Sequence, residues 1–147
     1  MDFSLTNSGI DPAKLRHALL RADAGGYCAF EGWVRNHHIG RDVLQLSYEA
    51  YSTLAQKQGA SVIATAKKRF ALLGASAVHR IGELVPGDLA VWVGVSSVHR
   101  SEAFQACQYI IDEIKATVPI WKHEFYADGT HEWVDPTHCN CARHSHP

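Results

Sequence analysis

The spacing of apolar residues along the chain predicts three helices. The first starts at Asp11-Pro12, because aspartate caps a helix and proline is tolerated at its first position, and it stops at Gly25-Gly26. The second is closed by Gly74, whereas the third is capped by Ser101 and ends near Thr117, since a proline follows two residues later. The expected ranges are 11–24, 52–73 and 101–117.

Alternating or continuous apolar runs predict strands at 27–34, 43–51, 75–84, 89–97 and 120–126. Residues 75–84 and 89–97 flank Pro86-Gly87-Asp88, a turn signal that predicts a β-hairpin. The polar stretch 35–42 predicts a loop. Helices and hairpins interleave without a regular strand–helix–strand repeat, so we expect an α+β fold with a largely antiparallel sheet and about three helices.

Composition narrows the class of protein. The chain has 147 residues, 46% hydrophobic and 20% charged, which is typical of one globular domain. The net charge is −1, so the chain lacks the broad positive field of a nonspecific nucleic-acid binder. No nucleic-acid partner is expected. No apolar stretch approaches about 18 residues and the first residues lack a signal peptide, which predicts a cytoplasmic protein without a membrane partner.

The C-terminal segment 137–147 is unusually rich in residues that bind soft and borderline metals. These are His138, Cys139, Cys141, His144 and His146. Their spacing matches no structural zinc pattern, and short C-terminal segments are usually disordered. We therefore expect one domain over residues 1–136 followed by a flexible tail, with a metal-handling protein as the alternative.

Four cationic side chains fall at the ends of predicted elements. His99 and Arg100 precede the third helix, where unpaired N–H groups and the helix dipole favour an anion. Lys115 lies in the last turn of that helix, where dipole compensation is the simpler explanation. Lys122 interrupts an apolar strand on the same face as Glu124, and a lysine that protects an edge strand is an equal alternative.

The distance between these cations predicts a quaternary structure. Lys115 follows His99 by sixteen residues, which corresponds to about 24 Å along a straight helix. One small ligand cannot contact both within one chain. If both serve one site, we expect a homodimer in which His99 and Arg100 of one subunit face Lys115 and Lys122 of the other.

Several ordered motifs resemble one known family. They are FEGWVRN at 30–36, YEAY at 48–51, HRIGEL at 79–84, VHRSEAF at 98–104, and the segment from Lys115 through PIWKHE at 119–124. The resemblance runs from about residue 3 to 135 and is to the large, catalytic subunit of molybdopterin synthase. Common nucleotide-binding, hydrolase and zinc-protease motifs do not occur.

The resemblance implies an α/β hammerhead fold and a sulfurtransferase of molybdenum-cofactor biosynthesis. Such a protein converts cyclic pyranopterin monophosphate to molybdopterin by installing a dithiolene. The sulfur comes from the C-terminal thiocarboxylate of a small ubiquitin-like subunit, within a heterotetramer built around a dimer of large subunits. No cofactor and no metal is implied for this step.

The resemblance also assigns roles to residues. Lys115 and Lys122 are implied to hold the thiocarboxylate and to move protons, with Lys115 as the first choice for the essential residue. The implied substrate-binding group is Arg35, His99, Arg100, Trp33, Val34, His123 and Glu124. Trp33 stands where similar chains often carry a basic or polar residue, and His123 where arginine is common. A noncatalytic module that only binds the ubiquitin-like partner is a further alternative.

Overall fold

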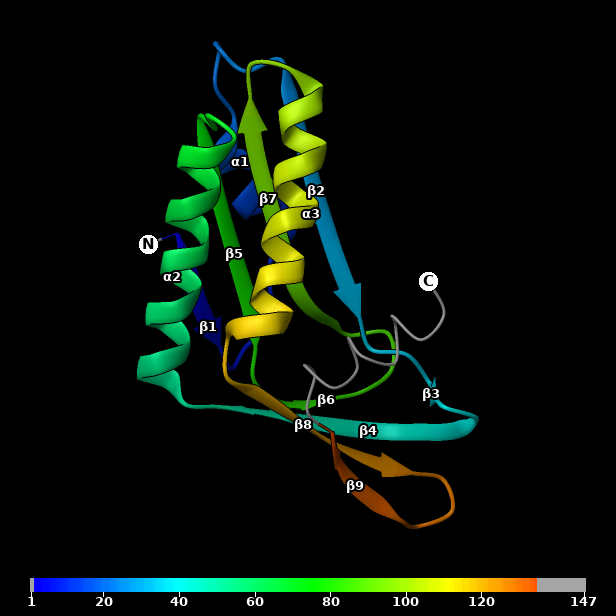
Figure 1. The fold of residues 1–147 in the computed structure, drawn as a ribbon. Coiled ribbons are helices and arrows are strands. Elements are labelled where there is room, and N and C mark those ends of the chain that lie inside the picture. The colour runs from blue at the N-terminus through cyan, green and yellow to red at the C-terminus, as the bar shows by residue number, and fades with distance from the viewer. Residues whose placement is uncertain (1, 135–147) are drawn as a thin grey trace.

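The computed structural model describes residues 2–134 and contains helices and strands in the order shown in Figure 1. They are β1 (Phe3–Thr6), α1 (Pro12–Leu19), β2 (Gly26–Trp33), β3 (His37–His38), β4 (Arg41–Ala50), α2 (Ser52–Arg69), β5 (Gly74–Arg80), β6 (Gly82–Leu84), β7 (Leu89–Ser97), α3 (Arg100–Thr117), β8 (Ile120–Tyr126) and β9 (His131–Val134). The predicted tail, with its metal-ligand candidates at 138, 139, 141, 144 and 146, lies outside the described residues.

The strands form two sheets. The first has the order β1-β5-β7-β2, in which only the β1–β5 pair is parallel. The second has the order β3-β4-β8-β9, with β6 also paired to β4, and all of its pairs are antiparallel. The predicted α+β class, with three helices and mostly antiparallel pairing, is confirmed within residues 2–134, but the strands divide into two sheets instead of one.

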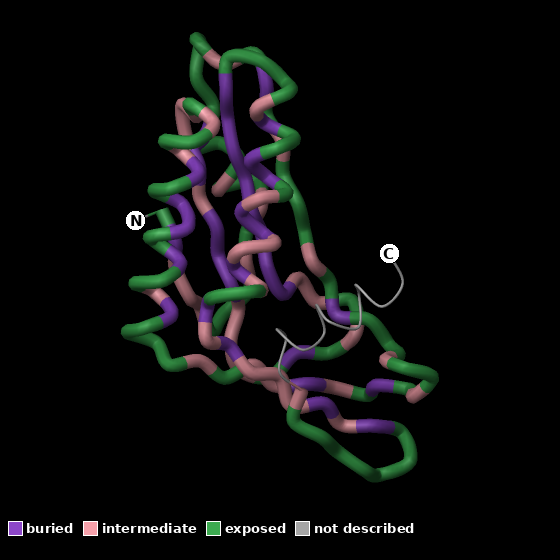
Figure 2. Tube along the Cα trace, in the orientation of Figure 1, coloured by how far each residue is buried: buried purple, intermediate pink, exposed green. Residues whose placement is uncertain are grey.

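The main core lies between the first sheet and the helices α2 and α3, which cover the same face of it (Figure 1). In Figure 2 the buried residues run along β5 and β7 and recur at intervals along both helices. The core side chains are mostly small or β-branched, for example Ile63, Ala66, Val93, Val95 and Ile110. A smaller cluster of Val34, Leu46, Leu84 and Ala90 connects the ends of β2 and β7 to the second sheet.

The first two helices begin where the sequence predicts and end several residues before their predicted ends. Asp11 caps α1 by accepting a hydrogen bond from the Lys14 amide at 3.3 Å. The helix stops at Leu19 because the next residue turns to extended backbone, and residues 21–25 form the turn into β2 instead of a last helical turn. In α2 the chain leaves the helix after Arg69, and Ala71 has a φ of 52°.

The cap predicted for α3 is wrong in detail. The helix begins at Arg100, so His99 occupies the cap position and makes no side-chain cap hydrogen bond. Ser101 lies inside the first turn, where its hydroxyl accepts from the Gln105 side-chain amide at 2.9 Å. The end at Thr117 is confirmed, because Val118 is extended before the proline.

The strand predicted at 75–84 is in fact two strands that belong to different sheets. Gly82, with a φ of 93°, lies at the break, a conformation that glycine adopts without strain. The first part, β5, pairs with β7 as the predicted hairpin requires, whereas β6 pairs with β4. The expected loop at 35–42 contains the short strand β3, which pairs with the start of β4. The sequence did not predict β1 or β9.

No helix within residues 2–134 is long and apolar enough to cross a membrane.

Helix α2 provides a test of the packing between the helix layer and β1. A Cβ added at Gly59 would lie 2.3 Å from ring atoms of Phe3, which is fully buried. Helix propensity alone favours alanine by about 1 kcal/mol, but we expect Gly59→Ala to lower the free energy of unfolding by about 1–3 kcal/mol because it overpacks the core. Urea denaturation measures this change. Ala60→Gly, at an exposed neighbouring position, calibrates the propensity effect, and a stabilised Gly59→Ala protein would contradict the prediction.

Candidate active site

The two candidate catalytic lysines lie on either side of the junction between α3 and the second sheet. Lys115 is in the last turn of α3, and Lys122 is the third residue of β8. Val118 and Pro119 make the turn between them, and the Pro119 carbonyl accepts from the Tyr51 amide at the end of β4. Figure 1 shows the lower end of α3 directly above this sheet. A short turn therefore brings both lysines to the same end of the molecule.

Lys122 forms an ion pair with Glu124, as the predicted strand alternation requires. Its Nζ lies 3.3 Å from Glu124 Oε2, and the two side chains are 16% and 3% exposed. Glu124 is buried in a sheet whose neighbouring strand β4 places Tyr48 opposite Lys122. An ammonium held by a buried carboxylate has little freedom to rotate, so Lys122 presents its charge in a defined direction.

The other oxygen of Glu124 accepts two further hydrogen bonds. His38 Nδ1 lies 2.6 Å from Oε1, and the Tyr126 hydroxyl donates to the same atom at 2.9 Å. Burial alone would raise the pKa of Glu124, but the charge of Lys122 and the hydrogen bonds from His38 and Tyr126 outweigh it and hold the pKa below its usual value. Glu124 is therefore a carboxylate at neutral pH.

A neutral histidine lies near Lys115. His79, at the end of β5, is 6% exposed, and its ring packs edge-on against Tyr48 with centroids 4.8 Å apart. Burial lowers the pKa of His79 to about 4, the charge of Lys115 also lowers it, and the hydrogen bond to the Arg80 carbonyl opposes the change. Because that carbonyl can only accept, Nδ1 carries the proton, and Nε2 is left as an acceptor.

The residues at the end of β2 differ in exposure. Arg35 is exposed, and Trp33 is 66% exposed, with its indole N–H donating to Glu31 at 3.1 Å. Val34 instead packs in the smaller core cluster, and its backbone binds Gly87 and Asp88. Arg35 and Trp33 can therefore reach a ligand with their side chains, whereas Val34 holds the end of the strand in place.

His99 and Arg100 lie at the opposite end of α3 from Lys115. Both are exposed, and the unbroken helix between His99 and Lys115 corresponds to the expected separation of about 24 Å. One chain therefore does not bring all of the predicted cations together.

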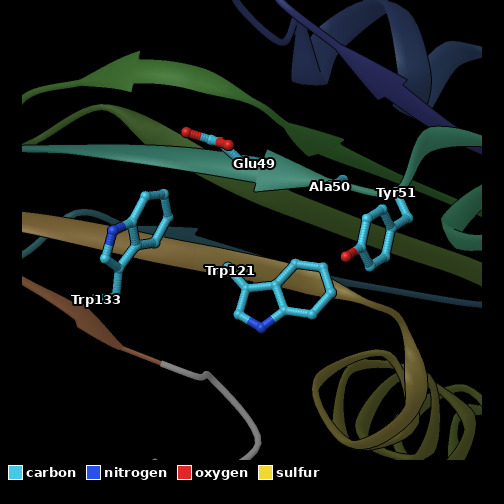
Figure 3. Close-up of a pocket in the computed structure, with 5 residues that line it drawn as sticks. All are labelled: Glu49, Ala50, Tyr51, Trp121 and Trp133. Carbon is cyan, nitrogen blue, oxygen red and sulfur yellow. The ribbon is translucent and has the colours of Figure 1, made fainter.

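His123 lies on the face of β8 that points away from Lys122. Its Nε2 is 2.9 Å from His131 Nδ1, and its ring stacks on Trp133 at a centroid distance of 4.3 Å. On the same outer face, a shallow aromatic pocket is lined by Glu49, Ala50, Tyr51, Trp121 and Trp133 (Figure 3). Strand alternation thus separates the aromatic face from the lysine face.

Comparison with known proteins decides the family. The MoaE protein family model matches residues 5–117. A molybdopterin synthase catalytic subunit from Thermoplasma volcanium is 45% identical over 129 residues, which covers 88% of this chain and 94% of that protein. Its counterpart from Escherichia coli K12 is 43% identical over 115 residues, or 78% and 76% of the two chains. The crystal structure of molybdopterin synthase from Staphylococcus aureus superposes with a TM-score of 0.86 at 34% identity, covering 91% of this chain and 97% of that one.

The chain belongs to the MoaE family of molybdopterin synthase catalytic subunits. It is therefore an enzyme of the sulfurtransferase class and, as a catalytic subunit, one component of a larger enzyme. The family predicted from the sequence motifs is confirmed. The individual roles of the site residues stay predictions.

The structure of this MoaE-family chain adds residues that the sequence did not single out. His38, Tyr126, His79 and Tyr48 all lie beside the predicted lysines or beside Glu124. Tyr48 and His79 lie in the motifs YEAY and HRIGEL that carry the family resemblance, but the sequence assigned no role to either of them. His38 and Tyr126 come to Glu124 through strand pairing, which the sequence pattern alone does not specify.

The low pKa of His79 predicts a pH dependence of stability. The unfolded chain protonates its histidine near pH 6.5, whereas the folded chain does so only near pH 4. The contribution of His79 to stability is therefore complete above pH 6.5 and is lost as the pH falls toward 4, by about 3 kcal/mol at most. We expect His79→Asn, which keeps a donor for the Arg80 carbonyl, to show a smaller loss of unfolding free energy between pH 7 and 4. Urea denaturation at each pH measures this difference, and parallel curves for the two proteins would contradict it.

Proposed function

We propose that this chain transfers sulfur from the C-terminal thiocarboxylate of a small ubiquitin-like subunit to cyclic pyranopterin monophosphate, forming the dithiolene of molybdopterin. The two reactants are both anionic, so bringing them together requires cations that offset their repulsion. The observation that carries the proposal is the pair of lysines at the α3–β8 junction, in a chain of the MoaE family. A cytoplasmic location stays a prediction.

The two lysines have different roles in this proposal. Lys122 Nζ is held 3.3 Å from Glu124 Oε2. This ammonium binds the negative charge of the thiocarboxylate while the thiocarboxylate sulfur attacks the pterin. Lys115 lies beside the neutral His79, whose pKa of about 4 keeps a second positive charge away from it at neutral pH. Lys115 therefore moves the protons that accompany sulfur attack, the departure of oxygen, and the hydrolysis by water that breaks the acyl C–S bond and leaves the small subunit with a carboxylate.

The remaining cations bind the substrate. Arg35 lies two residues after the end of β2 and is exposed, so it is available for the cyclic phosphate. His99 and Arg100 contribute from the start of α3, where the helix N-terminus adds its own affinity for an anion.

Replacing Lys115 tests the proposed chemistry. We expect Lys115→Ala to lower the conversion of cyclic precursor by about 100-fold or more, the range typical of a lost proton-transfer group. The assay combines the purified chain with thiocarboxylated small subunit and measures molybdopterin. Lys68→Ala, at an exposed position on α2, is the matched control and should match the unmodified chain. Near-normal conversion by Lys115→Ala would exclude the role assigned to Lys115. If the unmodified chain binds the small subunit but forms no molybdopterin, the alternative of a noncatalytic binding module is favoured.

The site needs a second copy of the chain if His99 and Arg100 take part. The geometry of β2 supports such a homodimer. This strand is an edge of the first sheet, and it exposes the apolar side chains of Tyr27, Phe30 and Trp33. An unpaired edge strand is a template for pairing with another chain.

Antiparallel pairing of β2 with its own copy would complete the site. A two-fold axis between Ala29 and Phe30 places Gly26 of one subunit opposite Trp33 of the other. Gly26 lies directly against His99 and Arg100, since a Cβ added there would be 3.0–3.1 Å from their backbone atoms. His99 and Arg100 of the second subunit would then approach Trp33 and, beyond the end of the strand, Arg35.

Mixing two inactive variants tests the shared site. In a homodimer with shared sites, Lys115→Ala and Arg100→Ala subunits form mixed dimers that each contain one intact site, so random mixing restores about a quarter of the activity. The control mixes Lys115→Ala with Lys122→Ala, which alter the same half of the site and should stay inactive. Activity is measured with thiocarboxylated small subunit after exchange of subunits. No recovery in the first mixture, with mixed dimers demonstrated, would contradict the shared site.

A further inference from the structure

The side chain of His38 connects the segment after β2 to the lysine site. His38 ends the short strand β3, and its Cα pairs with that of Arg41 at the start of β4. The two residues between them, Ile39 and Gly40, have φ values of 50° and 74°. Two consecutive positive φ values are typical of a tight type I′ hairpin turn, but a β-branched isoleucine rarely adopts this conformation. Favourable contacts on both sides of the turn must offset this cost.

Those contacts attach the hairpin to β8 and β9. On one side, His38 Nδ1 lies 2.6 Å from Glu124 Oε1. On the other, the Arg41 guanidinium lies 3.6 Å from the centre of the Tyr126 ring and forms an ion pair with Glu132 at 3.0 Å. The hairpin is therefore fixed at both of its flanking residues, and the carbonyl of Asn36, next to Arg35, accepts from the Val43 amide of β4 at 2.8 Å.

The carboxylate of Glu124 divides its two oxygens between different partners. His38 and the Tyr126 hydroxyl both occupy Oε1, at 2.6 and 2.9 Å. The other oxygen, Oε2, lies 3.3 Å from Lys122 Nζ. With both donors on Oε1, the carboxylate cannot rotate about its terminal bond without breaking charge-assisted hydrogen bonds in a buried site.

We propose that His38 is a positioning residue of the sulfur-transfer site, which acts by orienting Glu124 so that its second oxygen holds Lys122 in place. This inference rests on the proposed role of Lys122. His38 does not contact the reactants. Its Nδ1 must carry a proton to donate to a carboxylate, and this holds for both the neutral ring with that tautomer and the imidazolium.

All charged and titratable neighbours of this carboxylate enter the expected pH effect. Glu124 is faced by His38 from β3, by Lys122 and Tyr126 from β8, and by Glu132, its cross-strand partner on β9. Arg41 of β4 contacts both Tyr126 and Glu132. The hydrogen bond from His38 is one of the effects that lower the pKa of Glu124. Removing this donor raises that pKa, so the ion pair with Lys122 is lost at a higher pH as the solution is acidified.

The experiment compares three variants with the unmodified chain. His38→Ala removes the donor, His38→Asn places an amide N–H near the position of Nδ1, and His37→Ala is the control, because His37 is the exposed neighbour on the same short strand. Conversion is measured with thiocarboxylated small subunit across pH. We expect His38→Ala to lower kcat by about tenfold and to move the acid limb of the kcat profile up by about one pH unit, the size expected for one lost charge-assisted hydrogen bond. His38→Asn should restore most of both, and His37→Ala should show neither change.

Two outcomes would overturn the proposal. One is a His38→Ala protein with the same kcat and acid limb as His37→Ala. The other is a raised KM for the cyclic precursor with unchanged kcat, which would mean that His38 only anchors the hairpin near Arg35. If His38→Ala does not fold, His38→Asn decides alone, since the proposal requires it to be active with an acid limb close to that of the unmodified chain.

A second measurement separates this inference from the proposed function. NMR titration of the Glu124 carboxyl carbon in the isolated chain requires no turnover. If the unmodified chain forms no molybdopterin, the proposed function fails, and the titration still decides the role of His38. A higher Glu124 pKa in His38→Ala than in His37→Ala supports the orienting contact, and equal pKa values overturn it.

Discussion

A buried carboxylate cannot keep its charge without compensation, and Glu124 is the buried carboxylate around which the second sheet is organised. Its partners come from β3 and β8, and through Tyr126 the network extends to Glu132 on β9. Removing one partner of a buried ion pair lowers the free energy of unfolding by about 3–5 kcal/mol. An ion pair on the surface contributes less than about 1 kcal/mol. The contacts that offset the buried charge of Glu124 therefore also hold Lys122 in place.

The first sheet imposes a different constraint on the site. Small and β-branched core side chains pack α3, a helix of 18 residues, against this sheet. A helix of this length separates the cations at its two ends by more than a small substrate can span. The fold therefore places Lys115 and Lys122 at one end of α3 and the exposed His99 and Arg100 at the other, and β2 is the edge strand of the first sheet through which the proposed second copy would join them.

Local patterns in the sequence account for the features of the site that depend on a single element. Strand alternation placed Lys122 and Glu124 on one face of β8, and the ion pair between them confirms it. The contact between His38 and Glu124 joins residues 86 positions apart and depends on the register of β4 against β8. It also depends on a turn containing Ile39, a residue that gives no turn signal. The break at Gly82 was missed for a related reason, because the two halves of that apolar stretch pair with strands of different sheets.

Three histidines near the site show why residue type alone does not assign a role. His79 is buried and stays neutral, with a pKa of about 4, so it can accept a hydrogen bond but adds no charge beside Lys115. His38 faces a carboxylate that holds it at 2.6 Å. His123, one residue from Lys122 in sequence, is stacked on Trp133 on the opposite face of β8. His123 therefore belongs to the aromatic outer face of the sheet, whereas the carboxylate that holds Lys122 is contacted by the more distant His38.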